Sequence, residues 1–272
     1  MHLFTVFLLV CLPTALLAVK CTDPPTGNKN STGTTTDVTD TVTDVVTDQP
    51  TAFPTTEAET TTPVPIRESW PQGKFSLLMA GNTCPEFSDF KKGYFYQDTE
   101  DFRNANDWPR DTAMIGPFKQ DGYHFRFCTE TDSKGDYLWE AGNYCIYKFS
   151  KKCPKGFQTG NITWDDENNY NQNTRKGRVP FGKYGRDTTV NFCCRDDGSA
   201  SAQISLPIAR PFYMLRYTEE CQKVRYMSVN EEVFKFDDED SGETKNSRFG
   251  AAPMDSGDAA NHILHFCLYR PM

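Results

Sequence analysis

The sequence predicts an all-β or β-rich fold, with a single disulfide-stabilised β domain preceded by a disordered, Thr-rich stalk. Short runs of alternating apolar and polar residues, broken by Gly, Pro, Asn or Asp, dominate the C-terminal part of the chain. No stretch there carries a helical stripe longer than about two turns. Eight of the ten cysteines lie between positions 84 and 267, and an even set in an oxidising compartment most simply pairs completely.

Residues 1–18 are predicted to be a secretory signal peptide. The run after His2 is apolar up to Ala18, which matches the hydrophobic region of a signal and is too short to span a bilayer comfortably. A core helix would need a polar face that this run lacks. No later stretch approaches 18 apolar residues, so we expect a secreted, extracellular protein without membrane insertion.

Residues 19–68 are predicted to form a Thr-, Pro- and Asp-rich, mucin-like disordered stalk. Sixteen Thr and six Pro stand among the 44 positions from 22 to 65, and seven acidic residues against one Lys supply most of the chain's net charge of −8. Such stretches of secreted proteins are commonly O-glycosylated and stiff, although a bare flexible linker has the same composition. Asn30 begins an Asn-Ser-Thr sequon and is a predicted N-glycosylation site.

Residues 69–272 are predicted to form the β-rich domain, which is long enough to bury a hydrophobic core. Asn161 begins a second sequon within it, Asn161-Ile162-Thr163, and is the other predicted glycosylation site. The runs with the clearest strand alternation are 124–128, 144–149, 188–192, 212–217 and 262–269.

The cysteines of the domain are predicted to form disulfides. They are Cys84, Cys128, Cys145, Cys153, Cys193, Cys194, Cys221 and Cys267. Cys193 and Cys194 are adjacent on a strand-like run, and because successive strand side chains face opposite ways, we expect them to bridge to different partners. The rest of the pairing stays open. Cys21 is left over once Cys11 leaves with the signal peptide, and we expect it to join two chains in a disulfide-linked dimer.

We expect neither an enzyme nor a nucleic-acid-binding protein. A pI near 5.1 argues against the basic face that displaces counterions from phosphates. The sequence holds no nucleophile elbow, zinc-protease helix motif or phosphate-binding Gly loop. The domain holds an even number of cysteines, so each can pair in a disulfide and no free thiolate is expected. His262 and His265 lie three positions apart on a predicted strand, where they face opposite ways and cannot chelate one metal ion.

Four acidic clusters are conspicuous, and three interpretations of them stay open. Solvated turns are the commonest fate of such residues, but carboxylates also bind Ca²⁺ or serve as the acid and base of glycoside hydrolysis. We therefore expect no cofactor, with Ca²⁺ as the one candidate ion. The clusters are 97–101, 164–167, 195–198 and 237–240.

Trp164 and nearby charged residues are the predicted ligand-binding residues. A flat ring can stack on a sugar face while carboxylates accept hydrogen bonds from the sugar hydroxyls, and an arginine can meet a peptide carboxylate. The alternative for any single Trp is burial at the edge of a sheet. The candidate set is Trp164, Asp165, Asp166, Glu167 and Arg195.

Ordered motifs along the domain are similar to those of a known family. They include Trp70-Pro71-Gln72-Gly73, Cys84-Pro85, Trp139-Glu140-Ala141-Gly142-Asn143-Tyr144-Cys145, Cys153-Pro154-Lys155-Gly156-Phe157, Asn191-Phe192-Cys193-Cys194-Arg195-Asp196-Asp197-Gly198, Pro211-Phe212-Tyr213 and Phe266-Cys267-Leu268-Tyr269. From about position 70 to 270 the chain resembles the apextrin C-terminal (ApeC) domain, and its eight domain cysteines agree with that family's pattern.

The resemblance implies an apextrin-like, secreted protein of an invertebrate mucosa or extracellular matrix. Several members of the family are implicated in recognising bacterial peptidoglycan and its muramyl peptide fragments. Some carry a pore-forming MACPF domain ahead of ApeC, whereas this chain has a Thr-rich segment there, so membrane lysis is not implied.

We therefore predict a secreted, non-catalytic recognition protein of innate defence that binds bacterial cell-wall peptidoglycan or muramyl peptides. The alternative is a structural extracellular-matrix protein of mucus, an apical coat or a mineralised tissue, whose partners are other matrix components. The acidic, Thr-rich segment and Cys21 motivate this alternative, because they suit hydration and cross-linking.

Overall fold

A computed structural model describes residues 66–99, 105–218, 220–238 and 245–272. These residues contain no helix and form thirteen strands of one sheet, in which each pair of strands is antiparallel. The predicted all-β fold is therefore confirmed. The predicted signal peptide and stalk, with Asn30 and Cys21, lie outside the described residues. Within the described ranges, no helix is long and apolar enough to span a membrane.

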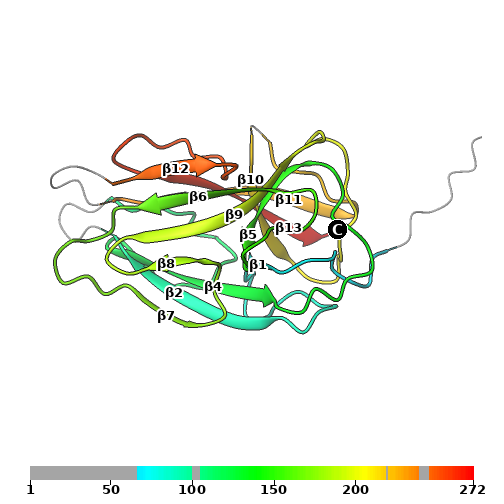
Figure 1. Ribbon diagram of the computed structural model, residues 1–272, viewed down its shortest axis with the longest axis horizontal. Coiled ribbons are helices and arrows are strands. Elements are labelled where there is room, and N and C mark those ends of the chain that lie inside the picture. The colour runs from blue at the N-terminus through cyan, green and yellow to red at the C-terminus, as the bar shows by residue number, and fades with distance from the viewer. Residues whose placement is uncertain (1–65, 100–104, 219, 239–244) are drawn as a thin grey trace, which may run out of the picture. The chain divides into compact units, whose positions relative to one another are not determined.

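The strands are short to medium in length and follow one another with turns or loops between them (Figure 1). Their bounds are β1 Phe75–Leu78, β2 Lys91–Asp98, β3 Phe118–Lys119, β4 Gly122–Glu130, β5 Asn143–Lys148, β6 Gln158–Trp164, β7 Thr174–Gly177, β8 Gly182–Tyr184, β9 Thr188–Asp196, β10 Phe212–Arg216, β11 Met227–Lys235, β12 Ser247–Gly250 and β13 Ile263–Pro271.

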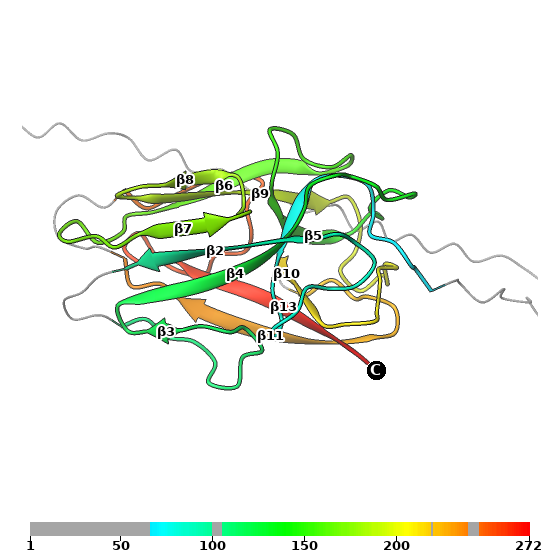
Figure 2. The same ribbon diagram turned by 90° about the horizontal axis from the view of Figure 1, so that it is seen from below.

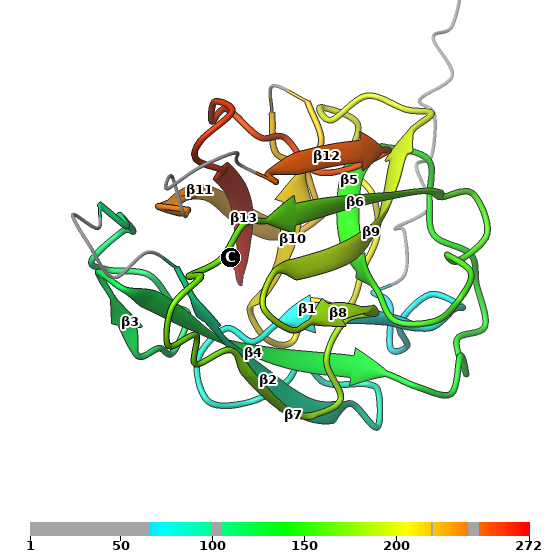
Figure 3. The same ribbon diagram turned by 60° about the vertical axis from the view of Figure 1, so that its left-hand side comes forward.

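The sheet has a main path and a branch. Along the main path the order is β11-β13-β10-β5-β1-β4-β2-β7, and the branch leaves β5 through β9, which also pairs with β6 and β8. Beyond β6, the strand β12 pairs with β6 alone and forms an edge. Figures 1 and 3 show β12, β6 and β9 on one side of the domain and β4, β2 and β7 on the other.

The larger hydrophobic core lies between strands that are distant in the sheet order. Phe125 of β4 and Phe234 of β11 have ring centroids 6.0 Å apart, although four strands separate β4 from β11 along the path. The sheet is therefore bent so that its inner face packs against itself. Alternation along β4 produces this inner face, because Tyr123, Phe125 and Phe127 are buried while the residues between them are half-buried and point outward.

A second core lies on the other face of β5, β9 and β10. Trp70 packs edge-on against Phe212 with ring centroids 5.1 Å apart, and Phe75 packs edge-on against Trp139 at 5.0 Å. The Trp70 indole nitrogen donates a hydrogen bond to a backbone carbonyl at 2.9 Å. Both faces of these central strands are thus buried, which explains why Tyr144, Cys145 and Ile146 read as a continuous apolar run.

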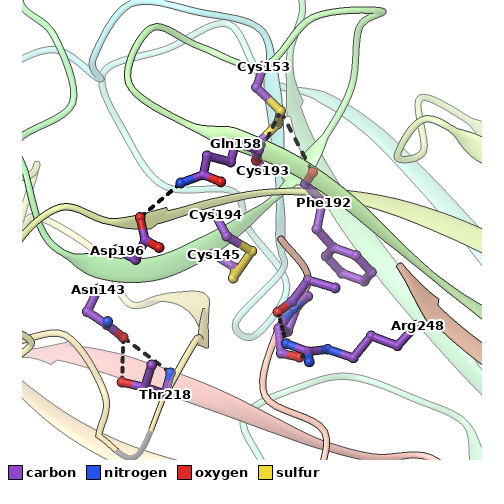
Figure 4. Close-up of a disulfide and its surroundings, with 12 residues drawn as sticks. Asn143, Cys145, Cys153, Gln158, Phe192, Cys193, Cys194, Asp196, Thr218 and Arg248 are labelled. Atoms are coloured by element: carbon purple, nitrogen blue, oxygen red, sulfur yellow. Dashed lines mark hydrogen bonds between the residues drawn. A yellow bond between two sulfur atoms is a disulfide. The ribbon is translucent and has the colours of Figure 1, made fainter. Parts of the chain in front are cut away.

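The eight domain cysteines form four disulfides: Cys84–Cys128, Cys145–Cys194, Cys153–Cys193 and Cys221–Cys267. The prediction that Cys193 and Cys194 bridge to different partners is confirmed, because β9 directs their side chains to opposite faces (Figure 4). Cys145 and Cys194 stand directly opposite each other in the register of β5 and β9.

The strand runs expected from the sequence are also found. The run 124–128 lies in β4, 144–149 overlaps β5, 188–192 lies in β9, 212–217 overlaps β10 and 262–269 overlaps β13.

Candidate functional site

The residues predicted to bind a ligand are buried. Trp164 ends β6, and Asp165, Asp166 and Glu167 follow it directly; together with Arg195 of β9, none of them is more than 7% exposed. The Trp164 ring packs against Phe236 with centroids 5.5 Å apart. The structure therefore gives Trp164 the core position that was its alternative, and the burial of these side chains does not support a stacking platform.

Asp166 is held by donors from three segments of the chain. Gln97 Nε2 and Asn173 Nδ2 each donate to its carboxylate at 2.8 Å, and Thr188 also bonds to it. Burial raises the pKa of Asp166 to about 7 despite these hydrogen bonds. The side chain therefore joins the end of β2 to the loop after β6, which is a structural task.

Asp238 and His262 form a second buried polar group beside it. Asp238 Oδ2 accepts hydrogen bonds from the His262 backbone at 3.0 Å and from Asn246 Nδ2 at 3.0 Å, while its Oδ1 is buried without a partner among the described residues. Burial, and then the charge of Asp166, raises the pKa of Asp238 well above its usual value. The His262 ring bonds to Asp255 at 2.5 Å through Nδ1 and to the Thr163 carbonyl at 2.9 Å through Nε2.

Arg195 is also committed to contacts within the protein. Its Nη1 donates to the Trp139 carbonyl at 2.7 Å, and its Nε donates to Asp197 Oδ1 at 2.9 Å. The hydrogen bond from Arg195 lowers the pKa of Asp197 to about 2. The guanidinium also lies over the Phe157 ring, with Cζ 5.5 Å from the centroid. Arg195 therefore joins three segments and offers few free donors to a peptide carboxylate.

The acidic clusters do not form a metal centre in the part of the chain that the structure describes. Within these ranges, no three His, Cys, Asp or Glu residues are arranged to hold a metal ion. The amides of Gln97 and Asn173 donate to the two oxygens of Asp166, one to each.

Ser256, His265 and Glu231 form a hydrogen-bonded chain. Ser256 Oγ lies 2.7 Å from His265 Nε2, and His265 Nδ1 lies 2.7 Å from Glu231 Oε1. Acyl transfer would also need backbone N–H groups free to stabilise an oxyanion. The amides of Ser256 and Gly257 are both engaged, since Ser256 N donates to Ile263 O and Gly257 N donates to Asp255 Oδ1. These hydrogen bonds instead connect the loop before β13, which holds Ser256, to His265 of β13 and to Glu231 of β11.

A different set of residues lines a groove of about 530 Å³ on the outer face of β7, β2 and β4. Figure 2 shows these three strands side by side. We call this feature the basic groove. Its lining residues are Met79, Asn82, Lys92, Gly93, Tyr94, His124, Arg126, Lys176 and Gly177.

The register of the three strands places cations around one aromatic ring. Tyr94 of β2 stands opposite Arg126 of β4 and opposite Lys176 of β7. Directly paired residues share a face of the sheet, and Lys92, two positions before Tyr94, lies on that face as well. Lys92, Arg126 and Lys176 therefore surround Tyr94 at the groove.

These three cations have no carboxylate partner among the residues that the structure describes. Lys92 Nζ donates to the Asn82 carbonyl at 3.3 Å, and among the described residues Arg126 Nε is buried without a hydrogen-bond acceptor. Lys92 and Lys176 are exposed, so their ammonium groups are accessible to an anion in the groove.

His124 adds a titratable group to the groove. Its ring lies 4.7 Å from the Tyr94 ring. Burial, and then the positive charge of Arg126, lowers the pKa of His124 below its ordinary value. A bound anion would oppose both effects and favour the protonated ring.

Two glycines lie where β7 approaches β2 at the groove. Gly93 of β2 pairs with Gly177 of β7. A Cβ on Gly93 would stand 2.1 Å from the Arg178 backbone oxygen, and Gly177 has a φ of 77°. Only glycine therefore allows β7 to approach β2 this closely.

The basic groove is not among the sites that the sequence predicts, which are built from acidic and Trp-containing motifs. One signal was present: His124 and Arg126 alternate with the aromatic residues of β4, and Lys92 and Tyr94 alternate in the same way on β2. Finding the groove also required the pairing of β2 with β4 and β7, which a single sequence does not supply.

The fold and the basic groove define a disulfide-bonded, all-β domain of the kind found in oxidising, extracellular environments. The family model for the C-terminal domain of apextrin (ApeC) matches residues 70–269. The chain belongs to this family, as its motifs predict. No curated protein and no solved structure matches the chain.

Proposed function

We propose that the chain is a secreted, non-catalytic recognition protein that binds carboxylate-bearing glycopeptide of the bacterial cell wall in the basic groove. The observation that carries this proposal is the group of three cations around Tyr94, none of which has a carboxylate partner among the described residues. It is unexpected on a chain whose net charge is −8, and it suits an anionic ligand.

The chemistry of muramyl peptides fits such a groove. In a muramyl peptide the lactyl carboxyl of muramic acid is joined to the peptide stem as an amide, and the stem carries the free carboxylates. Lys92, Arg126 and Lys176 can meet these carboxylates with charge-assisted hydrogen bonds. The face of the Tyr94 ring can pack on the apolar face of a sugar. A volume of about 530 Å³ lies within the usual range of ligand sites.

The proposal includes the predicted organisation of the rest of the chain. A signal peptide at 1–18 would direct secretion, a glycosylated stalk at 19–68 would display the domain, and a Cys21 disulfide would pair two domains. Two linked grooves would bind a repetitive wall polymer more tightly than one, by roughly 10²–10⁴ where the geometry permits. The four disulfides support an extracellular location.

A pull-down of the secreted protein on insoluble peptidoglycan tests the proposal. We expect the wild type to pellet with the wall, and soluble muramyl dipeptide to compete better than uncharged N-acetylglucosamine dimer. The double variant Arg126→Met/Lys176→Met should bind about tenfold more weakly, because two partly exposed ion pairs are lost. Lys183→Met, which removes an exposed charge from β8, is the matched control and should bind like wild type.

Two results would contradict the proposal. One is wild-type protein that stays in the supernatant while an established wall-binding protein pellets. The other is binding that the double variant leaves unchanged. The matrix alternative rests on the Thr-rich segment and Cys21, which lie outside the described residues; native protein that dissolves only with reductant or acid would favour it.

A further inference from the structure

The edge strand β12 presents an aromatic side chain to solvent. All four of its residues are exposed, and Phe249 is 75% exposed. Figure 1 shows β12 beside β6 at the border of the domain. A large apolar ring exposed to water on an edge strand is unfavourable and promotes association with other chains. We therefore expect another group to cover it.

The residue directly opposite Phe249 is Asn161 of β6. Directly opposed residues of an antiparallel pair have Cβ atoms about 4.5–5.5 Å apart and share one face. Ile162, next to Asn161, is buried in the core, so Asn161 and Phe249 both lie on the outer face of the sheet.

The side chain of Asn161 is available for modification. It is partly exposed, and within the described residues its amide makes no hydrogen bond with other side chains or the backbone. Thr163 completes the Asn-Ile-Thr sequon two positions later on the same face, where its hydroxyl lies 3.0 Å from that of Thr189. The sequon therefore lies on a regular strand, with its Asn pointing outward.

On the side away from β12, Asn161 is bordered by Asn191 of β9, which stands opposite it. The Nδ2 of Asn191 donates to the Phe181 carbonyl at 3.1 Å. Asn161 thus lies between the exposed Phe249 of β12 and the hydrogen-bonded Asn191 of β9.

We propose that Asn161 carries an N-linked glycan whose first N-acetylglucosamine residue packs on the ring of Phe249. In the transfer, C1 of this sugar bonds to Asn161 Nδ2 as its C1–O bond to a lipid pyrophosphate donor breaks and the amide nitrogen releases a proton. The apolar face of the sugar then covers the Phe249 ring, and the glycan shields the β12 edge from other strands. This inference requires entry into the secretory pathway but does not depend on ligand binding in the basic groove.

The test uses the full chain secreted from eukaryotic cells behind an established signal peptide, so that it does not depend on the chain's own signal. Asn30 is replaced by Gln throughout to remove the other sequon. We expect treatment with peptide N-glycosidase to reduce the mass of the protein, and Asn161→Gln to abolish that reduction. Thermal unfolding is then followed with and without the enzyme treatment.

Removing the glycan should lower the unfolding midpoint by about 2–4 °C, the size expected for the loss of one aromatic contact in a domain of this length. In Phe249→Ser the midpoint should no longer depend on the glycan. Tyr170→Ala is the matched control, because it removes a 93% exposed ring elsewhere without creating a new sequon after Asn168, and it should retain the difference. Secreted protein without a glycan on Asn161, or a midpoint difference that persists in Phe249→Ser, would overturn the proposal.

Discussion

Lowering the pH from 8 to 5 should stabilise the domain, because two buried carboxyl groups act on each other at the ends of β6 and β11. The pKa of Asp166 is raised to about 7 by burial, and burial and the charge of Asp166 raise that of Asp238 well above its usual value. A carboxyl group whose pKa is raised by folding keeps its proton in the folded state at pH values where the unfolded chain has released it. Its contribution to stability is therefore present at low pH and is lost as the pH rises through the folded pKa.

The size of the effect follows from the pKa of Asp166. Between pH 5 and about 7 the folded state binds this proton and the unfolded state does not, at about 1.4 kcal/mol per pH unit. The free energy of unfolding should therefore fall by roughly 3 kcal/mol between pH 5 and pH 8. For a domain of about 200 residues this corresponds to a fall in midpoint on the order of 10 °C.

The substitution Asp238→Asn removes the second carboxyl group, so that its part in the pH dependence of stability can be told from that of Asp166. The Asn oxygen can still accept from the His262 backbone and from Asn246, while the amide group takes the place of the unpartnered Oδ1. The variant should match the wild type at pH 5 and exceed it at pH 8. Thermal unfolding at both pH values measures this, with exposed Asp111→Asn as the control. His124 is replaced by Gln in all proteins, since its lowered pKa acts in the opposite direction. A wild type no more stable at pH 5 than at pH 8, or a variant with unchanged pH dependence, would refute the reasoning.

Binding of muramyl dipeptide should strengthen as the pH falls from 7.5 to 5.5, because a bound carboxylate raises the lowered pKa of His124 and couples proton uptake to binding. Calorimetric titration checks this, and His124→Asn that retains the pH effect would contradict it. Arg195→Met should lower the free energy of unfolding by about 3 kcal/mol, since buried charge-assisted hydrogen bonds are lost; an unchanged urea midpoint argues otherwise. Replacing Cys145 and Cys194 together by Ala should lower it by about 4 kcal/mol, given the 49-residue separation, and calorimetric unfolding without that loss would disprove the estimate.

Strand positions and the behaviour of the cysteines could be predicted because they depend on local alternation. Apolar side chains recur at every second position of β4 and β13, and the same alternation directs Cys193 and Cys194 to opposite faces of β9. The order of the strands could not be predicted. It depends on contacts between segments far apart in the chain, such as the pairing of β1 with both β4 and β5.

The candidate site was harder to predict, for a physical reason. Trp164 and the carboxylates after it have the chemistry of a sugar-binding site, but the same side chains also join loops when amide donors surround them, as Gln97 and Asn173 surround Asp166. Composition does not distinguish the two cases, because burial decides between them. The sequence does not predict Tyr94 as a binding residue, because the cations around it lie on neighbouring strands and only the strand register shows that they are close.

The two neighbouring cysteines of β9 create a hazard for anyone who refolds this domain. If β9 moved by one residue along β5, Cys193 would face Cys145 and Cys194 would turn toward Cys153. Every sulfur would still find a partner, so the product would be an isomer of identical mass that no free-thiol assay detects. Such a slip would also turn Val190 and Phe192 out of the larger core. The isomer would therefore lack the native packing of the larger core, and peptide mapping under non-reducing conditions is what distinguishes it from the native protein.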